Sequence, residues 1–211
     1  MDKICHRMEL GKDTYTLGKI RPEMEEELCR VLADFVRIME GYRVDDYRAT
    51  ASSAISEASN SLYVLGKIHQ LTGFSVTVLS NSEQRFLSYK ALAAMEDNFN
   101  KIIEKGTAIL DLDGGSFQIS LFDKDALVTT QNIRMGSLRI RERLAGIQSE
   151  TEHYEEMVEE LIWNEVSSFK KMYLKDRKIE NIMLIGDVFT DSVYQNIEEK
   201  TTKIISRENF N

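Results

Sequence analysis

The hydrophobic positions of the chain follow helical spacing in some stretches and alternate in others, which predicts a mixed α/β protein. The first twenty residues are expected to be extended or turn structure. Pro22 suits the first turn of a helix, and Gly41 suits its end. After this helix we expect a strand near Tyr47–Thr50, a small helix within 52–60, a helix over Leu62–Leu71 stopped by Gly73, a β-rich stretch over Phe74–Leu79 and a helix capped by Ser82.

A second α/β pattern follows the polar stretch Asp97–Gly106, which we interpret as a boundary. It opens with three β-like stretches that predict an antiparallel meander, and helices and one more strand follow it. The expected elements are strands over Thr107–Leu112, Phe117–Phe122 and Ala126–Gln131, a helix over Gly136–Leu144, an amphipathic helix from a Ser149/Glu152 capping box to about Lys175, a strand over Ile182–Ile185, a helix over Asp187–Asn196 and a polar tail.

Composition narrows the class of protein. The formal net charge of −8 argues against a protein that grips a nucleic-acid backbone by charge. No stretch has the roughly 18 apolar residues that a transmembrane helix needs, and no signal peptide is expected at the N-terminus. Cys5 and Cys29 lack CxxC spacing, which indicates a reducing compartment without a zinc site or a disulfide framework. We therefore expect a cytoplasmic protein with neither a nucleic-acid nor a membrane partner.

The stretch from Asp111 to Ser116, DLDGGS, is the strongest candidate for chemistry. Consecutive glycines after a strand let backbone N–H groups converge on an anion, and Ser116 adds a hydroxyl donor. Asp111 at the strand end could hold a divalent metal or orient water. The alternative is a plain β-turn, because Asp-Gly-Gly is also ordinary turn chemistry.

Two further positions could contribute to a site. Glu83 follows a predicted strand, so its carboxylate could act as a general base, although a glutamate in a first helical turn also serves the helix dipole. Gly136 permits close backbone approach at a helix start, and Arg139 could pair with phosphate. The alternative for Arg139 is a solvent-exposed position on an amphipathic helix.

Four blocks occur in a fixed order along the chain: RATASSAISEASN, TGFSVTVLSNSEQRFLSY, GTAILDLDGGSFQISLF and NIRMGSLRIRERL. In this order and spacing they resemble the exopolyphosphatase/guanosine pentaphosphate phosphohydrolase (Ppx/GppA) family. The resemblance implies the fold of the actin-like ATPase/sugar-kinase superfamily, with two ribonuclease-H-like α/β domains. We expect these domains at 1–103 and 104–211, the first without its opening strands.

The resemblance also implies an activity, the hydrolysis of terminal phosphoanhydride bonds of polyphosphate or guanosine pentaphosphate with Mg²⁺. Glu83 matches the proposed catalytic base that activates water, and Asp111 matches the aspartate that helps to hold the metal. The positions implied to contact phosphate are Gly114, Gly115, Ser116, Gly136 and Arg139. A homodimer is compatible with the same resemblance.

Several residues depart from the family pattern. Ser56 stands at a family arginine, Asp113 at the first glycine of the loop and Gln118 at an acidic residue. Only Gly186 remains of a later Gly-Gly-Thr turn, and nothing matches the first phosphate loop of the family. These departures define a second hypothesis, in which the chain is a catalytically inactive relative that binds a phosphorylated ligand or a protein partner.

Overall fold

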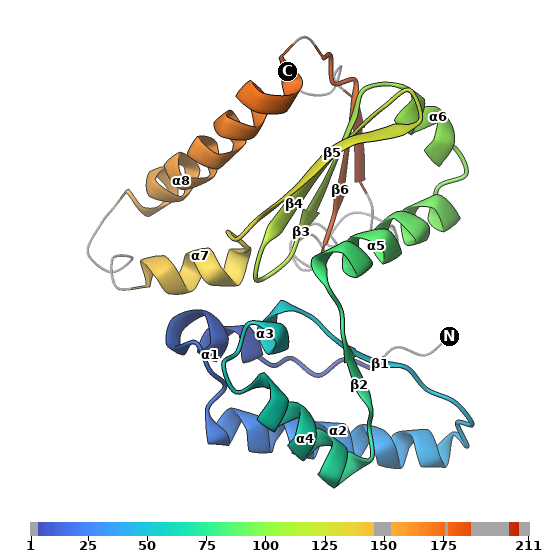
Figure 1. Ribbon diagram of the computed structural model, residues 1–211, viewed down its shortest axis with the longest axis vertical. Coiled ribbons are helices and arrows are strands. Elements are labelled where there is room, and N and C mark those ends of the chain that lie inside the picture. The colour runs from blue at the N-terminus through green and yellow to red at the C-terminus, as the bar shows by residue number, and fades with distance from the viewer. Residues whose placement is uncertain (1–3, 146–152, 176, 187–202, 207–211) are drawn as a thin grey trace. The chain divides into compact units, whose positions relative to one another are not determined.

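The computed structural model describes residues 4–145, 153–175, 177–186 and 203–206 (Figure 1). The chain divides into two compact units, residues 1–84 and 85–211. Each unit contains helices and its own sheet, so the expected mixed α/β class is confirmed. The two units are described separately below.

Unit 1 is built on a short parallel sheet. Strands β1 and β2 pair in register from Ala49 with Val76 to Ala51 with Val78. The buried core includes Val64, Ile68 and Phe74, which pack with Cys29 of the long helix. The elements of the unit are α1 (Leu10–Leu17), α2 (Pro22–Gly41), β1 (Ala49–Ala51), α3 (Ser53–Ser56), α4 (Ser61–Thr72) and β2 (Val76–Val78).

The start of α2 and the end of α4 lie where the sequence predicted. Pro22 occupies the first turn of α2, and the helix ends at Gly41. Gly73 ends α4 in the left-handed conformation, with φ at 74°. Between the two helices, buried Glu25 makes an ion pair with Lys67 at 2.5 Å.

Helix α1 corrects the expectation that the first twenty residues are extended or turn structure. Asp13 of this helix is buried, and its carboxylate accepts hydrogen bonds from the backbone N–H and the side-chain Nε of Arg21, each at 2.9 Å. This tertiary pairing fixes the helix against the start of α2. It joins two polar residues, so hydrophobic spacing did not reveal it.

Unit 2 contains a mixed five-stranded sheet in the order β5-β4-β3-β6-β7. The meander β3-β4-β5 is antiparallel as predicted, whereas β3 and β6 are parallel and β6 and β7 are antiparallel. The elements are α5 (Asn81–Met95), which begins in unit 1, α6 (Phe99–Glu104), β3 (Thr107–Leu112), β4 (Phe117–Asp123), β5 (Ala126–Ile133), α7 (Ser137–Leu144), α8 (Tyr154–Phe169), the π-helical turn η1 (Lys170–Leu174), β6 (Asn181–Ile185) and β7 (Lys203–Ser206).

Alternating residues of β3 contribute to two separate cores. Ile109 packs with Leu92 of α5 and Ile103 of α6. Leu110 packs with Phe117 and with Phe169 of α8. Neighbouring side chains of a strand point to opposite faces, so α5 and α6 cover one face of the sheet while α7 and α8 lie on the other (Figure 1).

The domain boundary expected between 103 and 104 stays a prediction, while the structure groups its residues into compact units at 1–84 and 85–211. The polar stretch Asp97–Gly106 forms α6, whose buried Phe99 and Ile103 pack with the sheet of unit 2. The polar residues on the exposed side of α6 therefore made this helix of unit 2 hard to predict from the sequence.

Other differences are local. Helix α5 begins at Asn81, so Ser82 lies inside the helix and does not cap it. Within the predicted amphipathic helix, α8 buries Phe169, whereas Leu161, Ile162 and Val166 are half-buried. The polar tail contains β7. The Ser149/Glu152 capping box and the helix predicted over 187–196 lie outside the described residues.

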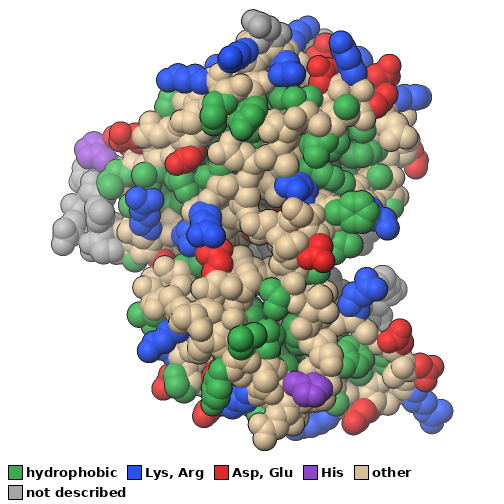
Figure 2. Space-filling model, viewed as in Figure 1, with side chains coloured by type: hydrophobic (Ala, Val, Ile, Leu, Met, Phe, Trp, Pro, Cys, Tyr) green, Lys and Arg blue, Asp and Glu red, His purple; other side chains and the backbone are tan. Residues whose placement is uncertain are grey.

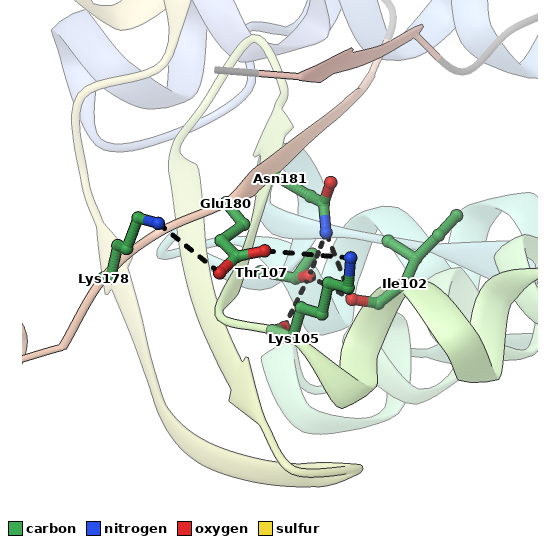
Figure 3. A network of polar contacts seen from close by, with 6 residues as sticks. All are labelled: Ile102, Lys105, Thr107, Lys178, Glu180 and Asn181. Carbon is green, nitrogen blue, oxygen red and sulfur yellow. Dashed lines mark hydrogen bonds and ion pairs between the residues drawn. The ribbon is translucent and has the colours of Figure 1, made fainter. Parts of the chain in front are cut away.

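A polar cluster ties together the starts of β3 and β6 (Figure 3). The hydroxyl of Thr107 donates to the carbonyls of Ile102 and Lys105 at 2.5 and 2.9 Å. The side-chain amide of Asn181 donates to the same Ile102 carbonyl and to the Thr107 hydroxyl, both at 3.3 Å. The cluster sets the parallel register at one end of these strands, which leaves the candidate site to the opposite end.

The surface carries the mixed character that the composition indicated. Figure 2 shows hydrophobic, acidic and basic side chains interspersed over the face in view. Among the helices of the described ranges, none combines the length and the apolar character that crossing a membrane would require.

Candidate functional site

The DLDGGS stretch forms the connection between β3 and β4. Leu112 ends β3, Phe117 begins β4, and the two residues are paired in the antiparallel ladder. The backbone N–H of Asp113 donates to the carbonyl of Ser116 at 3.0 Å and closes the hairpin. We call residues 113–116 the hairpin loop.

Helix α7 binds the hairpin loop through successive carbonyl groups. The carbonyl of Asp113 accepts from the N–H of Ser137 at 3.2 Å. The carbonyl of Gly114 accepts from the N–H of Arg139 at 3.0 Å, and that of Gly115 accepts from the Arg139 Nε at 2.8 Å. These contacts hold one side of the loop backbone against the first turn of the helix.

This arrangement determines the direction of the loop N–H groups. In a trans peptide the N–H of one residue points opposite to the carbonyl of the residue before it. The N–H groups of Gly114, Gly115 and Ser116 therefore point away from α7. Within the described parts of the chain, these three groups have no hydrogen-bond acceptor. Folded proteins rarely leave such donors unpaired, and convergent N–H groups bind anions.

Gly136 permits the close contact between α7 and the hairpin loop. A Cβ at this position would lie 2.4 Å from the Asp113 carbonyl oxygen and from the backbone nitrogen of Ser116. Any other residue would force the helix and the loop apart. Gly136 thus allows a close backbone approach, and its partner in that approach is the loop itself.

Asp111 lies near the C-terminal end of β3. Its neighbour on the antiparallel side is Gln118, and on the parallel side it is Ile185. Its Oδ2 accepts a hydrogen bond from the hydroxyl of Ser88 on α5 at 3.0 Å. The carboxylate is therefore held at the end of the loop strand by a residue that the sequence did not single out.

Asp111 is a carboxylate at the end of β3 that could serve as one ligand of a divalent cation. No group of three or more acidic, histidine or cysteine side chains that could hold a metal occurs among the residues the structure describes. Mg²⁺ often keeps several waters and uses one or two carboxylates together with substrate phosphates. Asp111 fits that pattern as the protein carboxylate.

Helix α5 contributes a second polar contact to the same face of the sheet. The hydroxyl of Tyr89 donates to Ser120 on β4 at 2.6 Å, and Ser120 lies 3.2 Å from the hydroxyl of Thr130 on β5. Arg85 donates to Thr130 at 3.3 Å. Burial raises the pKa of Tyr89, so the ring stays a neutral hydrogen-bond donor. These contacts fix the helix that carries Ser88.

Glu83 belongs to the first turn of α5 and forms a capping box with Ser80. Its Oε2 accepts hydrogen bonds from the N–H of Ser80 at 2.8 Å and from the Ser80 hydroxyl at 2.7 Å. The N–H of Glu83 donates back to that hydroxyl at 3.2 Å. Hydrogen bonds from the Ser80 backbone and side chain hold the pKa of Glu83 below its usual value.

The predicted site residues thus fall into separate groups. The loop glycines, Ser116, Gly136 and Arg139 lie together in unit 2, and Asp111 is on the strand that leads into the loop. Glu83 lies at the end of unit 1. Ser80 and Ser88 were not among the residues predicted from the sequence. The S-x-x-E spacing of Ser80 and Glu83 could have revealed the first, whereas no local signal indicates the second.

The model of the Ppx/GppA phosphatase family matches residues 1–211. A bifunctional 3-dehydroquinate synthase/phosphatase of Fusobacterium nucleatum is 21% identical over 202 residues, which cover 92% of this chain and 29% of that protein. Exopolyphosphatase 1 of Mycobacterium leprae is 27% identical over 114 residues, which cover 54% of this chain and 32% of that protein. This chain thus spans about a third or less of either relative's length.

Solved structures show the fold. The Aquifex aeolicus member of the Ppx/GppA family has a TM-score of 0.61 and 20% identity, over 90% of this chain and 60% of that chain. An exopolyphosphatase of Cytophaga hutchinsonii also has a TM-score of 0.61 and 20% identity, over 84% of this chain and 55% of that chain. The α/β fold is therefore shared with these proteins.

Proposed function

This chain belongs to the Ppx/GppA phosphatase family, and from that premise we propose that it hydrolyses the terminal phosphoanhydride bond of inorganic polyphosphate or of guanosine pentaphosphate. The observation that carries the proposal is the set of N–H groups at Gly114, Gly115 and Ser116, for which the described residues supply no acceptor. These donors suit phosphate oxygens, because they are fixed in place before the ligand arrives.

Each part of the loop has a task in this proposal. The three N–H groups and the Ser116 hydroxyl bind the oxygens of the terminal phosphate. Arg139 supports the loop through the carbonyl of Gly115. Gly136 keeps α7 close enough for that support. A rigid loop of this kind contributes positioning, which is the main requirement of phosphoryl transfer.

Asp111 would hold Mg²⁺ together with phosphate oxygens, and the ion would offset the negative charge of the phosphates. The hydroxyl of Ser88 orients that carboxylate. We propose Glu83 as the base that takes a proton from the attacking water. The water oxygen forms a bond to the terminal phosphorus, the bridging P–O bond breaks, and the products are orthophosphate and a chain shorter by one phosphate.

One observation favours the second candidate function, a relative that binds a phosphorylated ligand without hydrolysing it. The carboxylate of Glu83 is already engaged by Ser80, and its lowered pKa makes it a weaker proton acceptor. The loop donors do not depend on Glu83. Binding without turnover is therefore a coherent outcome for this chain.

The deciding experiment measures orthophosphate release and ligand binding side by side. Wild type, Glu83→Gln and the exposed control Glu26→Gln are incubated with long-chain polyphosphate or guanosine pentaphosphate and Mg²⁺. The hydrolase proposal expects release by wild type and Glu26→Gln, and a loss of roughly 100-fold or more in Glu83→Gln. Calorimetric titration with polyphosphate reports binding for the same variants.

The results separate the two functions. If no variant releases orthophosphate but polyphosphate binding is retained, the hydrolase proposal is overturned and the binding function is supported. Loss of binding in Ser116→Ala, with normal binding in the exposed control Ser168→Ala, would assign that binding to the hairpin loop. If wild type binds no polyphosphate and releases no orthophosphate, both proposed functions are contradicted.

A further inference from the structure

A large apolar cavity lies in unit 2 between the sheet and the helices α7 and α8, with a volume of about 960 Å³. One wall consists of Leu110, Leu112 and Ile119 of the sheet, and another of Val158, Ile162 and Trp163 of α8. Pockets of roughly 300–1,000 Å³ hold drug-sized ligands in proteins. The cavity is therefore large enough for a small molecule.

The cavity adjoins the hairpin loop through Leu112, Phe117 and Ser137, but it lies on the other face of the sheet from the Asp111 carboxylate. Leu110 and Leu112 line it, whereas Asp111 between them projects to the opposite face of the sheet, where Ser88 of α5 contacts it. A ligand in the cavity would accordingly meet apolar side chains and not the carboxylate. A ligand of the cavity is thus distinct from the phosphate proposed for the hairpin loop.

Charge at the cavity indicates the class of ligand. The charged residues that line it are Arg141 and Lys170, and both are cations in a chain with a net charge of −8. Arg141 also contacts Glu142 at 3.3 Å, so part of its charge is already offset. The acidic residues Glu155 and Glu159 lie near the other end of α8, in an adjoining groove that shares Tyr154, Val158, Ile162, Trp163 and Val166 with the cavity. Lys170 is thus the main candidate partner for an anionic group.

Helix α8 lines the cavity with apolar side chains that are incompletely buried. Trp163 is 61% exposed although it lines the cavity, and its apolar neighbours Val158 and Ile162 are half-buried. The helix changes to π-helical hydrogen bonding at Lys170–Leu174, which includes two lining residues, Lys170 and Leu174. Single π-helical turns occur frequently at functional sites.

From this combination we infer that the cavity binds a single-chain anionic amphiphile, a fatty-acid carboxylate. The alkyl chain lies between the sheet and α8, where it covers apolar surface that otherwise faces water. The carboxylate lies at Lys170 on the rim. The protein thereby has a lipid-derived ligand site in addition to its phosphate loop.

Trp163 is the single tryptophan of the chain and lines both the cavity and the adjoining groove, so its fluorescence reports on ligands bound at either place. Dodecanoate is titrated into the full chain below the concentration at which it forms micelles. The expected result is a saturable blue shift of the emission, because the alkyl chain displaces water from the indole. Calorimetry of the same titration gives the stoichiometry, expected to be one per chain, and detects binding that leaves the indole unchanged.

Two matched changes test the role of charge. Lys170→Glu is expected to weaken dodecanoate binding by about tenfold or more, because it reverses a charge at the rim. Lys171→Glu makes the same charge change one residue away, at a position that does not line the cavity, and should leave binding within about twofold. Circular dichroism establishes that both variants are folded.

Three outcomes overturn the inference. Absence of saturable binding by both fluorescence and calorimetry excludes the site. Equal affinity for dodecyltrimethylammonium, a cation with the same alkyl chain, shows apolar adsorption without the proposed headgroup contact. Equal loss in Lys170→Glu and Lys171→Glu shows a general effect of net charge.

Discussion

The hydroxyl of Ser88 on α5 donates a hydrogen bond to Oδ2 of Asp111 on β3, with 3.0 Å between the oxygens. The two residues are 23 positions apart in the sequence and come from different elements. The bond fixes the orientation of the carboxylate that leads into the hairpin loop. Ser88 therefore acts through Asp111, as a positioning residue.

Ser88→Ala is expected to weaken Mg²⁺ binding in the presence of pyrophosphate by about 10–100-fold, the usual effect of losing a group that orients a metal ligand. Calorimetric titration of Mg²⁺ measures this affinity. Ser88→Thr retains a hydroxyl and should recover most of it, whereas Ser168→Ala on the exposed side of α8 should change nothing. Unchanged Mg²⁺ affinity in Ser88→Ala would show that the bond is only structural.

Gly136→Ala should destabilise the protein because the added Cβ would overlap the backbone of the hairpin loop, 2.4 Å from three of its atoms. Such overpacking costs about 1–3 kcal/mol. For a chain of this size, each kcal/mol corresponds to a fall of roughly 2–4 °C in Tm. Gly66→Ala is the control, because α4 has open space at that position and alanine favours a helix. Equal Tm values for both variants would contradict the packing described for Gly136.

Ser80→Ala removes the hydroxyl from the capping box of α5 and should raise the pKa of Glu83 toward its usual value. The backbone N–H of Ser80 remains, so the recovery is partial. NMR titration of the Glu83 carboxyl group measures the change. The pKa of Glu83 is depressed in the folded state, so its contribution to stability is present above the unfolded pKa and disappears as the pH falls through the folded value.

If Glu83 is the catalytic base, the same variant has a kinetic signature. The lower limb of the pH–rate profile for phosphate release should move to higher pH in Ser80→Ala, in parallel with the NMR value. A shift of the NMR pKa without any shift of that limb would separate Glu83 from the proton transfer.

Asp13 in unit 1 should make stability depend on acid. Burial pushes the pKa of Asp13 up, but hydrogen bonds from the side chain and backbone of Arg21 outweigh it, and the pKa lies below its usual value. The stabilisation is thus complete above the unfolded pKa of about 3.9 and is lost as the pH falls below it. Urea unfolding of wild type and Asp13→Asn between pH 2 and 7 tests this expectation. The difference in stability between them should be largest at neutral pH and shrink below about pH 4; a constant difference would contradict it.

Much of the local structure could be predicted because it depends on local chemistry. Pro22 at a helix start, Gly73 at a helix end and the alternating pattern of β3, β4 and β5 each act through a few neighbouring residues. The main difference from the prediction is α6, which forms within the polar stretch Asp97–Gly106 that was interpreted as a boundary. Its helix depends on buried Phe99 and Ile103, which pack with strands that lie later in the sequence.

The candidate site divides in the same way. The sequence by itself determined the family, the order of the blocks and the loop residues Gly114, Gly115 and Ser116, because these follow from residue identity and spacing. Tertiary structure alone decided which groups of the loop are available. Helix α7 engages the loop carbonyls, and peptide planarity then directs the N–H groups the other way. That choice depends on contact between segments some twenty residues apart, which no local pattern of side chains encodes.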